Sequence, residues 1–394
     1  MRNIIVEKPY RFHAPVESRF WPAVLGTYLP VYLRRSHGLV SVAVQGEERL
    51  QASVAAGHGI MLAPNHCRPC DPMVLAQVAV RLKLRLFIMA SRHLFEESAV
   101  QRYLLRRAGA FSLYREGMDR ESLKCAVTLL AEARRPLVVF PEGVISRTND
   151  RLNPLMEGVS FMARSAAKQR AALPPGGRVV IHPVAIRYRF DGDLDAALDP
   201  VLTDIERRLS WRPMDEGLSA RIARIGKALL ALKEIQYLGE VRTGPVTERL
   251  AGLIDRLLGP LEAEWIKGRR EPDVVGRVKA LRTAILADMV TGELAEPERA
   301  RRWRQLEDCY LAQQLHFYPP DYFAPDASRE KMLETVERFE EDLTDAVTVH
   351  APVRALVEVG EAIEVGVTRE RGTDGDPVMG RVRDQLLAML GRAT

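Results

Sequence analysis

The sequence predicts an α/β fold: a central mixed sheet with flanking helices, and a large helical region that is either an insertion or a C-terminal addition. Two observations predict this class. Residues 38–193 alternate short apolar runs with helical patterns of ten or more residues, as in a sheet covered by helices. Residues 201–348 are instead charged and helix-patterned, and strand-like runs return after residue 352.

The elements of the first region follow from apolar runs, periodicity and chain breakers. The strand at 137–140 runs directly into Pro141-Glu142-Gly143, and the strand at 59–63 leads into the loop Asn65–Asp71. Strands are predicted at 59–63, 84–90, 110–114, 137–140 and 178–188, and helices at 71–82, 96–107, 120–133 and 158–170.

The second region contains long helical patterns, and strand chemistry then returns near the end of the chain. We favour one α/β domain interrupted by a helical insertion, whose last strand rejoins the sheet; a separate helical C-terminal domain with its own hairpin is the alternative. No internal repeat or low-complexity tract is evident. The long helices are predicted at 218–238, 246–267 and 274–290, the strands at 353–359 and 363–365, and a closing amphipathic helix at 378–390.

These patterns divide the chain into four segments. Residues 1–37 form an N-terminal segment, 38–200 the α/β domain, 201–348 the helical insertion, and 349–394 the returning strands and closing helix. The insertion suits a lid, a dimer surface or a docking element for a carrier protein.

Composition indicates a globular protein, because hydrophobic residues make up 47% and charged residues 28% of the 394. The net charge of +5 suits an anionic partner, such as a phospholipid surface, a nucleic acid or an acidic carrier protein, but equally a solvated basic surface. Four cysteines in a chain of this length do not make a disulfide framework and favour a reducing compartment.

The N-terminal segment bears on membrane association. Residues 1–10 carry charges where a secretion signal needs an apolar core, and no stretch reaches the ~18 uninterrupted apolar residues of a transmembrane helix. Residues 21–33 form an apolar run with an aromatic start, followed by Arg34 and Arg35. Such a segment either lies in a membrane interface or forms a buried N-terminal helix. We expect a cytoplasmic protein peripherally associated with the inner membrane.

The loop after the strand at 59–63 carries the first candidate for chemistry. A neutral histidine is the usual acceptor of a proton near neutral pH, and a carboxylate on its other ring nitrogen fixes the tautomer and supports the developing charge. His66 and Asp71 are five residues apart across a turn stiffened by Pro69, so their side chains can meet. Asp71 before Pro72 also fits a helix N-cap, and the two roles are compatible.

Further polar residues follow two other predicted strands. Glu142 and Gly143 come directly after the strand at 137–140, and Ser146 and Arg147 follow within five residues. Arg115 ends the strand at 110–114. Ligands bind at the carboxyl ends of strands in open α/β sheets, and arginines pair with phosphate bidentately. Two arginines and a glutamate beside a candidate general base predict a site for a phosphorylated alcohol, although surface solvation is the commoner fate of a single arginine.

These residues, His66 and Asp71 included, lie in three of four sequence blocks in which the chain resembles the glycerolipid acyltransferases of the lysophosphatidic acid (1-acylglycerol-3-phosphate) acyltransferase type. The blocks occur in the family's order over about residues 40–190 and are Asn65 to Asp71, Gly109 to Arg115, Phe140 to Arg147, and Ile181-His182-Pro183-Val184-Ala185. The resemblance implies a glycerolphosphate acyltransferase-like fold and direct acyl transfer.

The resemblance also implies roles for individual residues. His66, oriented by Asp71, would deprotonate the acceptor hydroxyl, which attacks a thioester. Arg115 would bind phosphate, and Glu142, Gly143, Ser146 and Arg147 would bind the acceptor. Pro183 and Val184 would line the acyl site.

The resemblance implies co-substrates rather than a bound cofactor. The donor would be acyl-CoA or acyl carrier protein, and the acceptor a lysophospholipid or related lipid at a membrane surface. The sequence departs from the family's pattern at two places that bear on the acceptor: Cys67 stands where a small hydroxyl residue is common, and Val144-Ile145 replaces threonine-arginine.

Other interpretations fit the sequence less well. A zinc site from His66, Cys67 and Cys70 lacks a fourth ligand, so no metal is expected, and nothing indicates an activated Cys67 nucleophile. No nucleic-acid-binding module is recognised. A non-catalytic lipid- or membrane-binding protein on the same fold, or acylation of a different lipid, is the remaining alternative.

Overall fold

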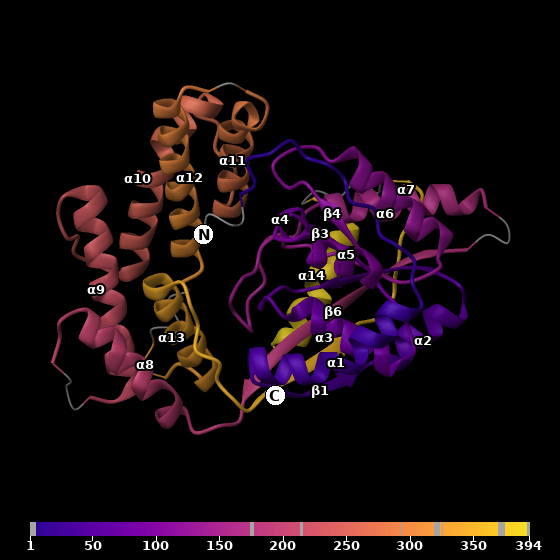
Figure 1. The fold of residues 1–394 in the computed structure, drawn as a ribbon, viewed down its shortest axis with the longest axis horizontal. Helices are drawn as coiled ribbons and strands as arrows, with labels where there is room; N and C mark the ends of the chain where they lie inside the picture. The colour runs from indigo at the N-terminus through magenta and orange to yellow at the C-terminus, as the bar shows by residue number, and fades with distance from the viewer. Residues whose placement is uncertain are drawn as a thin grey trace. The chain divides into compact units, whose positions relative to one another are not determined.

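The computed structural model describes residues 5–173, 177–212, 216–292, 294–318, 324, 326–368 and 375–391. The chain divides into two compact units. One contains residues 10–191 and 349–394, and is called the α/β unit below. The other contains residues 1–9 and 192–348, and is called the helical unit. Figure 1 labels the helices and strands of both.

The α/β unit is built on one mixed sheet, which confirms the predicted fold class. Over the described residues the strand order is β1-β7-β6-β2-β5-β3-β4, with β8 beside β6. All neighbouring pairs are parallel except β6 with β7 and β6 with β8. The strands are β1 (Leu39–Gln45), β2 (Gly59–Pro64), β3 (Phe87–Ser91), β4 (Ala110–Leu113), β5 (Leu137–Val138), β6 (Val179–Phe190), β7 (Val353–Val359) and β8 (Ile363–Glu364).

The chain leaves this sheet after β6 and returns to it as β7. Strand β7 pairs antiparallel with β6, from Val184↔Val359 to Phe190↔Val353, and parallel with β1. The helical unit is therefore inserted between two neighbouring strands of one sheet. The division into units falls after Asp191 rather than at residue 200, so the helix that begins at Leu194 belongs to the helical unit.

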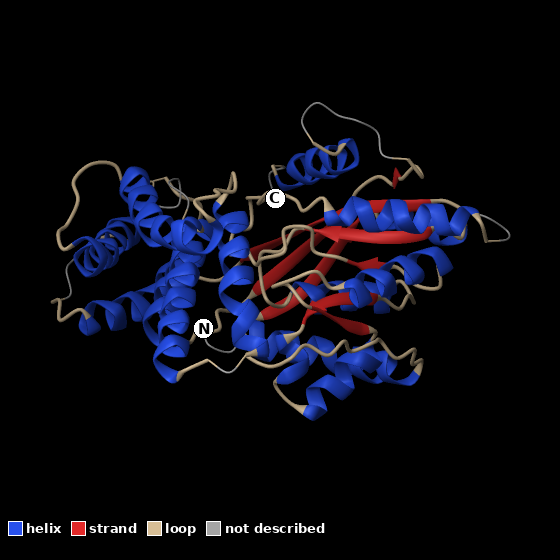
Figure 2. Ribbon diagram, turned by 90° about the horizontal axis from the view of Figure 1, so that it is seen from above, coloured by secondary structure: helices blue, strands red, loops and turns tan. Residues whose placement is uncertain are grey.

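Helices cover both faces of the sheet (Figure 2). One face packs its apolar side chains against α6, α7 and α14, with fully buried Met61, Phe87, Phe111 and Ile181 in the centre. The other face is covered by α1, α2 and α3. The helices of this unit are α1 (Phe20–His37), α2 (Glu47–Ala55), α3 (Asp71–Arg81), α4 (His93–Glu96), α5 (Ala99–Ala108), α6 (Arg120–Glu132), α7 (Gly158–Ala171) and α14 (Pro377–Leu390).

The helical unit has its own apolar core, centred on Leu253, Leu258, Leu281 and Ile285. The N-terminal residues of the chain belong to this unit: Glu7 accepts a hydrogen bond from the Trp303 indole and pairs with Arg299. Its helices are α8 (Leu194–Arg208), α9 (Leu218–Leu238), α10 (Val246–Ile266), α11 (Val274–Thr291), α12 (Glu296–His316) and α13 (Arg329–Thr344).

Three successive helix pairs of this unit are joined by the same buried ion pair. In each, an arginine donates through Nε and Nη2 to the two oxygens of a glutamate 15 residues earlier, at 2.6–3.1 Å. The pairs are Glu206–Arg221, Glu234–Arg249 and Glu262–Arg277.

These ion pairs recur every 28 residues, as do the starts of α9, α10 and α11 at residues 218, 246 and 274. The first and third arginines also bind an aspartate 22 residues earlier, Asp199 and Asp255. The expectation of no internal repeat is therefore wrong. The repeat includes the two charged positions, the helix starts and buried apolar positions: Leu202, Leu230, Leu258 and Leu286 are 28 residues apart, as are Ile225, Leu253 and Leu281.

Two further differences from the sequence expectations concern the sheet. The sequence predicts no separate element between residues 38 and 58, yet β1 and α2 lie there. The strand predicted at 137–140 shortens to Leu137–Val138, because Pro141 has no N–H and the chain turns after Phe140. Among the residues described, no helix combines the length and apolarity needed to cross a membrane.

Candidate active site

The candidate site lies at one edge of the sheet, where parallel strands end. His66 follows β2, Glu142 follows β5 and Arg115 follows β4, and these three strands run in the same direction through β3. The carboxyl ends of parallel strands meet at one edge, where ligands bind in open α/β sheets. The expectation that these side chains share an edge therefore matches the topology.

His66 and Asp71 form a hydrogen-bonded pair. Nδ1 of His66 lies 2.8 Å from Oδ2 of Asp71, whose side chain is completely buried. Asp71 is the first residue of α3, and no side-chain hydrogen bond caps this helix. Its Oδ2 instead also accepts the backbone N–H of Arg68 at 2.9 Å. The carboxylate is thus directed at the histidine loop, and the N-cap role expected from Asp71-Pro72 is wrong.

The carboxylate fixes the tautomer of His66, because an ionised Asp71 only accepts hydrogen bonds and so binds Nδ1–H. The imidazole Nε2 has no hydrogen-bond partner among the described residues. The ring stacks on Phe140 with centroids 4.0 Å apart, which holds its orientation. A histidine in this state presents a lone pair at Nε2 to an incoming proton.

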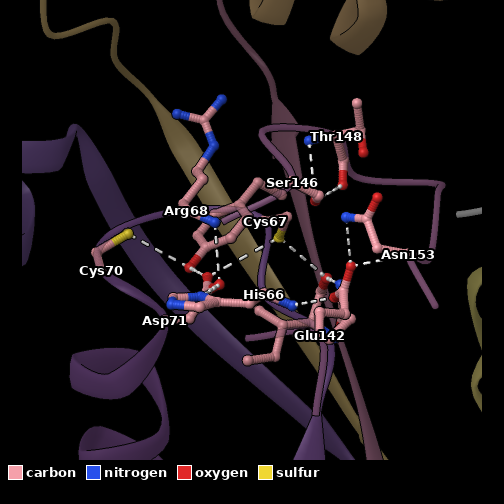
Figure 3. Close-up of polar contacts among 12 residues, drawn as sticks. His66, Cys67, Arg68, Cys70, Asp71, Glu142, Ser146, Thr148 and Asn153 are labelled. Carbon is pink, nitrogen blue, oxygen red and sulfur yellow. Dashed lines mark hydrogen bonds and ion pairs between the residues drawn. The ribbon is translucent and has the colours of Figure 1, made fainter. Parts of the chain in front are cut away.

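The backbone of His66 is held on both sides by the loop that follows β5. Its N–H donates to Oε1 of Glu142 at 2.7 Å, and its carbonyl accepts the N–H of Ser146 at 2.7 Å. Figure 3 shows Glu142 next to the His66 backbone and the Asp71 carboxylate next to the imidazole. Residues 66 and 142–146 therefore form one hydrogen-bonded cluster.

Glu142 is buried inside this hydrogen-bonded cluster. Its side chain is 1% exposed, and its Oε2 accepts the backbone N–H and the side-chain amide of Asn153, at 2.9 and 2.8 Å. Burial raises the pKa of Glu142 to about 7, although the hydrogen bonds from Asn153 and His66 oppose the shift. The sequence interpretation, in which Glu142 holds an acceptor hydroxyl, does not match these contacts.

The other predicted acceptor residues lie in or against the same loop. The Arg115 guanidinium donates to the carbonyl of Gly143. Gly143 has φ +68°, a left-handed backbone conformation that favours glycine. Ser146 is buried, with its hydroxyl on the Thr148 carbonyl. Arg147 is partly exposed and has φ +59°.

Pro183 and Val184 lie on β6 beside the strand that leads to His66. They pair with Ala63 and Pro64 of β2, and the Asn65 N–H donates to the Val184 carbonyl at 3.3 Å. Val184 also lines a small apolar cavity between the sheet and helices α2 and α3, together with Leu50, Leu62, Leu75, Val78, Ala79, Leu84, Leu86, Val357 and Val359. Pro183 is not among the residues that line this cavity.

Strand β6 continues beyond the end of β2, and two asparagine side chains bind its backbone there. The Asn65 amide exchanges two hydrogen bonds with the backbone of Ile186, at 3.0 and 2.7 Å. The Asn149 amide does the same with Tyr188, at 2.6 and 2.8 Å. An unsatisfied buried backbone group costs about 1–3 kcal/mol, so these amides stabilise both loops of the site against β6.

The sequence pattern indicates no role for Tyr188 or for the asparagines. The Tyr188 hydroxyl donates to Oδ1 of Asp71 at 2.6 Å, from a strand 117 residues away. No local pattern marks that contact, whereas Asn65 adjoins His66 and could have been noticed. Cys67 and Cys70 are buried and hydrogen-bonded through sulfur to the Ile186 carbonyl and the Tyr188 hydroxyl. Within the described ranges, no three His, Cys, Asp or Glu side chains are grouped to hold a metal ion.

Backbone N–H groups of the His66 loop are candidates to bind the oxyanion of an acyl-transfer intermediate, but two of them are already used. Those of His66 and Arg68 donate to Glu142 and Asp71. An oxyanion formed beside His66 would therefore need other donors.

Comparison with known protein families identifies the region that contains this site. A model of the acyltransferase family matches residues 41–187, from β1 to β6. This segment is similar to the domains of that family. The match confirms the family resemblance and supports acyl transfer, and hence a transferase. A search of curated proteins found no match.

The matched segment contains the four sequence blocks. Strands β7 and β8, which complete the sheet, and α14, which packs on it, lie outside the matched segment.

Proposed function

We propose that the protein transfers a fatty acyl group from a thioester, acyl-CoA or acyl carrier protein, to the hydroxyl of a lysophospholipid such as lysophosphatidic acid. The acyltransferase family match supports the reaction class. The observation that carries the mechanism is the His66–Asp71 pair, in which Nδ1 is bound at 2.8 Å and Nε2 has no partner among the described residues. This is the arrangement of a general base that acts on an alcohol.

In the proposed reaction, Nε2 of His66 takes the proton of the acceptor hydroxyl as its oxygen attacks the thioester carbonyl. Asp71 supports the imidazolium that forms, as in the Ser-His-Asp template. The tetrahedral intermediate then expels the thiolate, which takes the proton back from His66. The C–S bond breaks, an oxygen ester forms, and a free thiol is released without an acyl-enzyme or a bound cofactor.

Arg115 and Arg147 are proposed to bind the acceptor's phosphate. The hydrogen bond from Arg115 to Gly143 brings the Arg115 guanidinium to the loop that carries Arg147. Arginine suits this role because its guanidinium fork matches two phosphate oxygens. Pro183 and Val184 remain proposed neighbours of the acyl chain.

The test uses purified protein with a panel of thioester donors and lysolipid acceptors. A new ester detected by lipid mass spectrometry, in step with free thiol, supports the proposal and identifies the donor and acceptor. A protein that releases no thiol with any donor, yet binds lipid vesicles, would be the non-catalytic lipid-binding protein of the same fold.

We further propose that the protein meets its acceptor at an anionic membrane surface, through α1 and α5. Phe20, Val24, Tyr28 and Val31 are 40–65% exposed and follow one face of α1 at helical spacing. Trp21 of α1 contacts Tyr103 of α5, so the two helices share this surface.

Basic residues end both helices: Arg34, Arg35 and His37 in α1, and Arg106 and Arg107 in α5. Aromatic rings at headgroup depth with arginines on phosphates are typical of interfacial helices. Vesicle cosedimentation should weaken for the double variant Phe20→Ser/Tyr28→Ser, and not for Phe161→Ser, an equally exposed phenylalanine on α7. Equal binding of both variants would contradict this location.

A further inference from the structure

Tyr188 makes a buried contact with the carboxylate of the proposed catalytic pair. Its hydroxyl donates to Oδ1 of Asp71 at 2.6 Å, and the residue is 3% exposed. Burial and the neighbouring negative charge of Asp71 raise the pKa of Tyr188 well above its usual value, so the hydroxyl stays a donor. The Cys70 thiol lies 3.3 Å from the same hydroxyl and can donate to it.

The position of Tyr188 is fixed by the sheet. On one edge of β6 its backbone N–H and C=O bind the Asn149 amide, and on the other edge Tyr188 pairs with Ala355 of β7. The Arg68 side chain lies over one face of the ring, with Cζ 5.3 Å from the centroid. The hydroxyl therefore reaches Asp71 from a rigid strand and not from a loop.

The two oxygens of Asp71 have separate donors. Oδ2 accepts from His66 Nδ1 and the Arg68 N–H, at 2.8 and 2.9 Å. Oδ1 accepts from Tyr188 and, at 3.9 Å, from the weak donor Cys67. Among the described residues Tyr188 is thus the one strong donor to Oδ1. Without it, the carboxylate would be held at Oδ2 alone, by His66 and the Arg68 N–H, and of the described donors Oδ1 would keep only the weak contact with Cys67.

We propose that Tyr188 is a positioning residue for acyl transfer, which through its hydroxyl sets both the orientation and the basicity of Asp71 and so tunes His66. This inference rests on the proposed function. A hydrogen bond to a carboxylate disperses its negative charge, which weakens the carboxylate's hold on a protonated partner. Removal of the hydroxyl should therefore raise the pKa at which His66 loses its proton.

Other charged and titratable groups also surround His66. Cys67, Arg68 and Cys70 come from its own loop, Asp71 from α3, and Glu142 from the loop after β5. Glu142 titrates near neutral pH, since burial raises its pKa to about 7. A comparison that leaves all of these groups unchanged isolates the contribution of Tyr188.

The experiment compares Tyr188→Phe with Tyr237→Phe. Tyr237 is a matched control, because its hydroxyl donates to Asp308 at 3.0 Å in the helical unit. For Tyr188→Phe we expect kcat to fall about ten-fold, KM to stay within about two-fold, and the acid limb of the pH–rate profile to move up by about half a unit. Tyr237→Phe should leave all three unchanged. An unmoved acid limb with normal kcat in folded Tyr188→Phe overturns the proposal.

A second measurement does not depend on turnover. Selective ¹⁵N-histidine labelling, with His66→Ala to assign the signal, gives the titration midpoint of His66 by NMR. The midpoint should rise in Tyr188→Phe and fall when 3-fluorotyrosine, a stronger donor of nearly the same size, replaces Tyr188. The fluorinated variant also covers the case in which Tyr188→Phe does not fold.

The two proposals can fail separately. A wild type that transfers no acyl group refutes the proposed function, while a His66 midpoint that is identical in all variants refutes the role of Tyr188.

Discussion

Glutamine in place of Glu142 removes one titrating carboxyl group from the interior beside His66 while keeping its shape. The pKa of Glu142 is raised from 4.5 to about 7 by burial. Below pH 4.5 the carboxyl group is protonated in both folded and unfolded chains. Between pH 4.5 and 7 the unfolded chain releases a proton that the folded protein keeps. The free energy of unfolding therefore falls as the pH rises through this window.

The size of the effect follows from the shift. One pKa unit corresponds to about 1.4 kcal/mol, so Glu142 should cost the protein about 3 kcal/mol of stability between pH 4.5 and 7.5. Glu142→Gln cannot titrate, and its stability relative to wild type should rise by that amount across the window. At pH 4.5 the Glu142→Gln variant should be less stable than wild type. Its side-chain NH₂ group would face backbone N–H groups whose hydrogen bonds the carboxyl oxygens of Glu142 accept.

The assay is urea unfolding at several pH values, followed by hydrogen exchange in peptides from β2 and β6, so that the α/β unit alone is observed. Glu157→Gln, an exposed glutamate before α7, is the control and should track wild type. A stability difference between Glu142→Gln and wild type that stays constant from pH 4.5 to 7.5 would refute the assignment of Glu142 as a buried group with a raised pKa.

Three further outcomes are expected. Arg147→Ala should raise KM for a phosphorylated acceptor about 10- to 100-fold, with little change in KM for the donor. Replacement of an exposed arginine, Arg178→Ala, should change neither KM. An equal rise in KM for donor and acceptor would argue against a phosphate site. Asp71→Asn should lower kcat about 10³- to 10⁴-fold in folded protein, since the amide cannot support the required tautomer, and a loss under ten-fold would remove Asp71 from the mechanism. Glu234→Ala should destabilise the helical unit by about 3 kcal/mol in urea unfolding, because Arg249 stays largely buried without its partner. Replacing both residues, by leucine and methionine, should restore most of the lost stability. No measurable loss in the single variant would show that this repeated ion pair is dispensable.

Much of the sheet could be predicted because its strands bury continuous apolar runs. All six residues of β2 are buried, and the run is visible in the sequence. The apolar pattern does not predict β1, because it is an edge strand in which only the Leu39 side chain is fully buried. The boundary predicted at residue 200 lies too late in the chain, because Leu194–Arg208 is a helix that continues the pattern of the domain before it.

The 28-residue repeat is readable in the sequence, because charged and apolar positions recur together at that spacing. Its helices share the glutamate–arginine positions, the helix starts and buried apolar positions such as Ile225, Leu253 and Leu281, while the loops differ. A search for charged pairs at a fixed spacing would have found Glu206–Arg221, Glu234–Arg249 and Glu262–Arg277.

The candidate site divides in the same way between local and distant contacts. His66 and Asp71 could be paired from the sequence because a five-residue turn limits their separation. The contacts of Glu142 and Tyr188 depend on how β5, β6 and α3 come together, and no local rule contains that information. The sequence therefore indicated which residues gather at the sheet edge, but not which of them face the substrate and which hold the loops.

The most direct test of the central claim is the rate of thiol release by His66→Ala beside His58→Ala. His58 lies in the turn before β2, and His66 lies just beyond the other end of that strand. If His66 is the general base, kcat should fall about 10²- to 10⁴-fold in His66→Ala, with vesicle binding retained, and should stay within about two-fold of wild type in His58→Ala. Thiol release by folded His66→Ala at the wild-type rate would contradict the proposed mechanism.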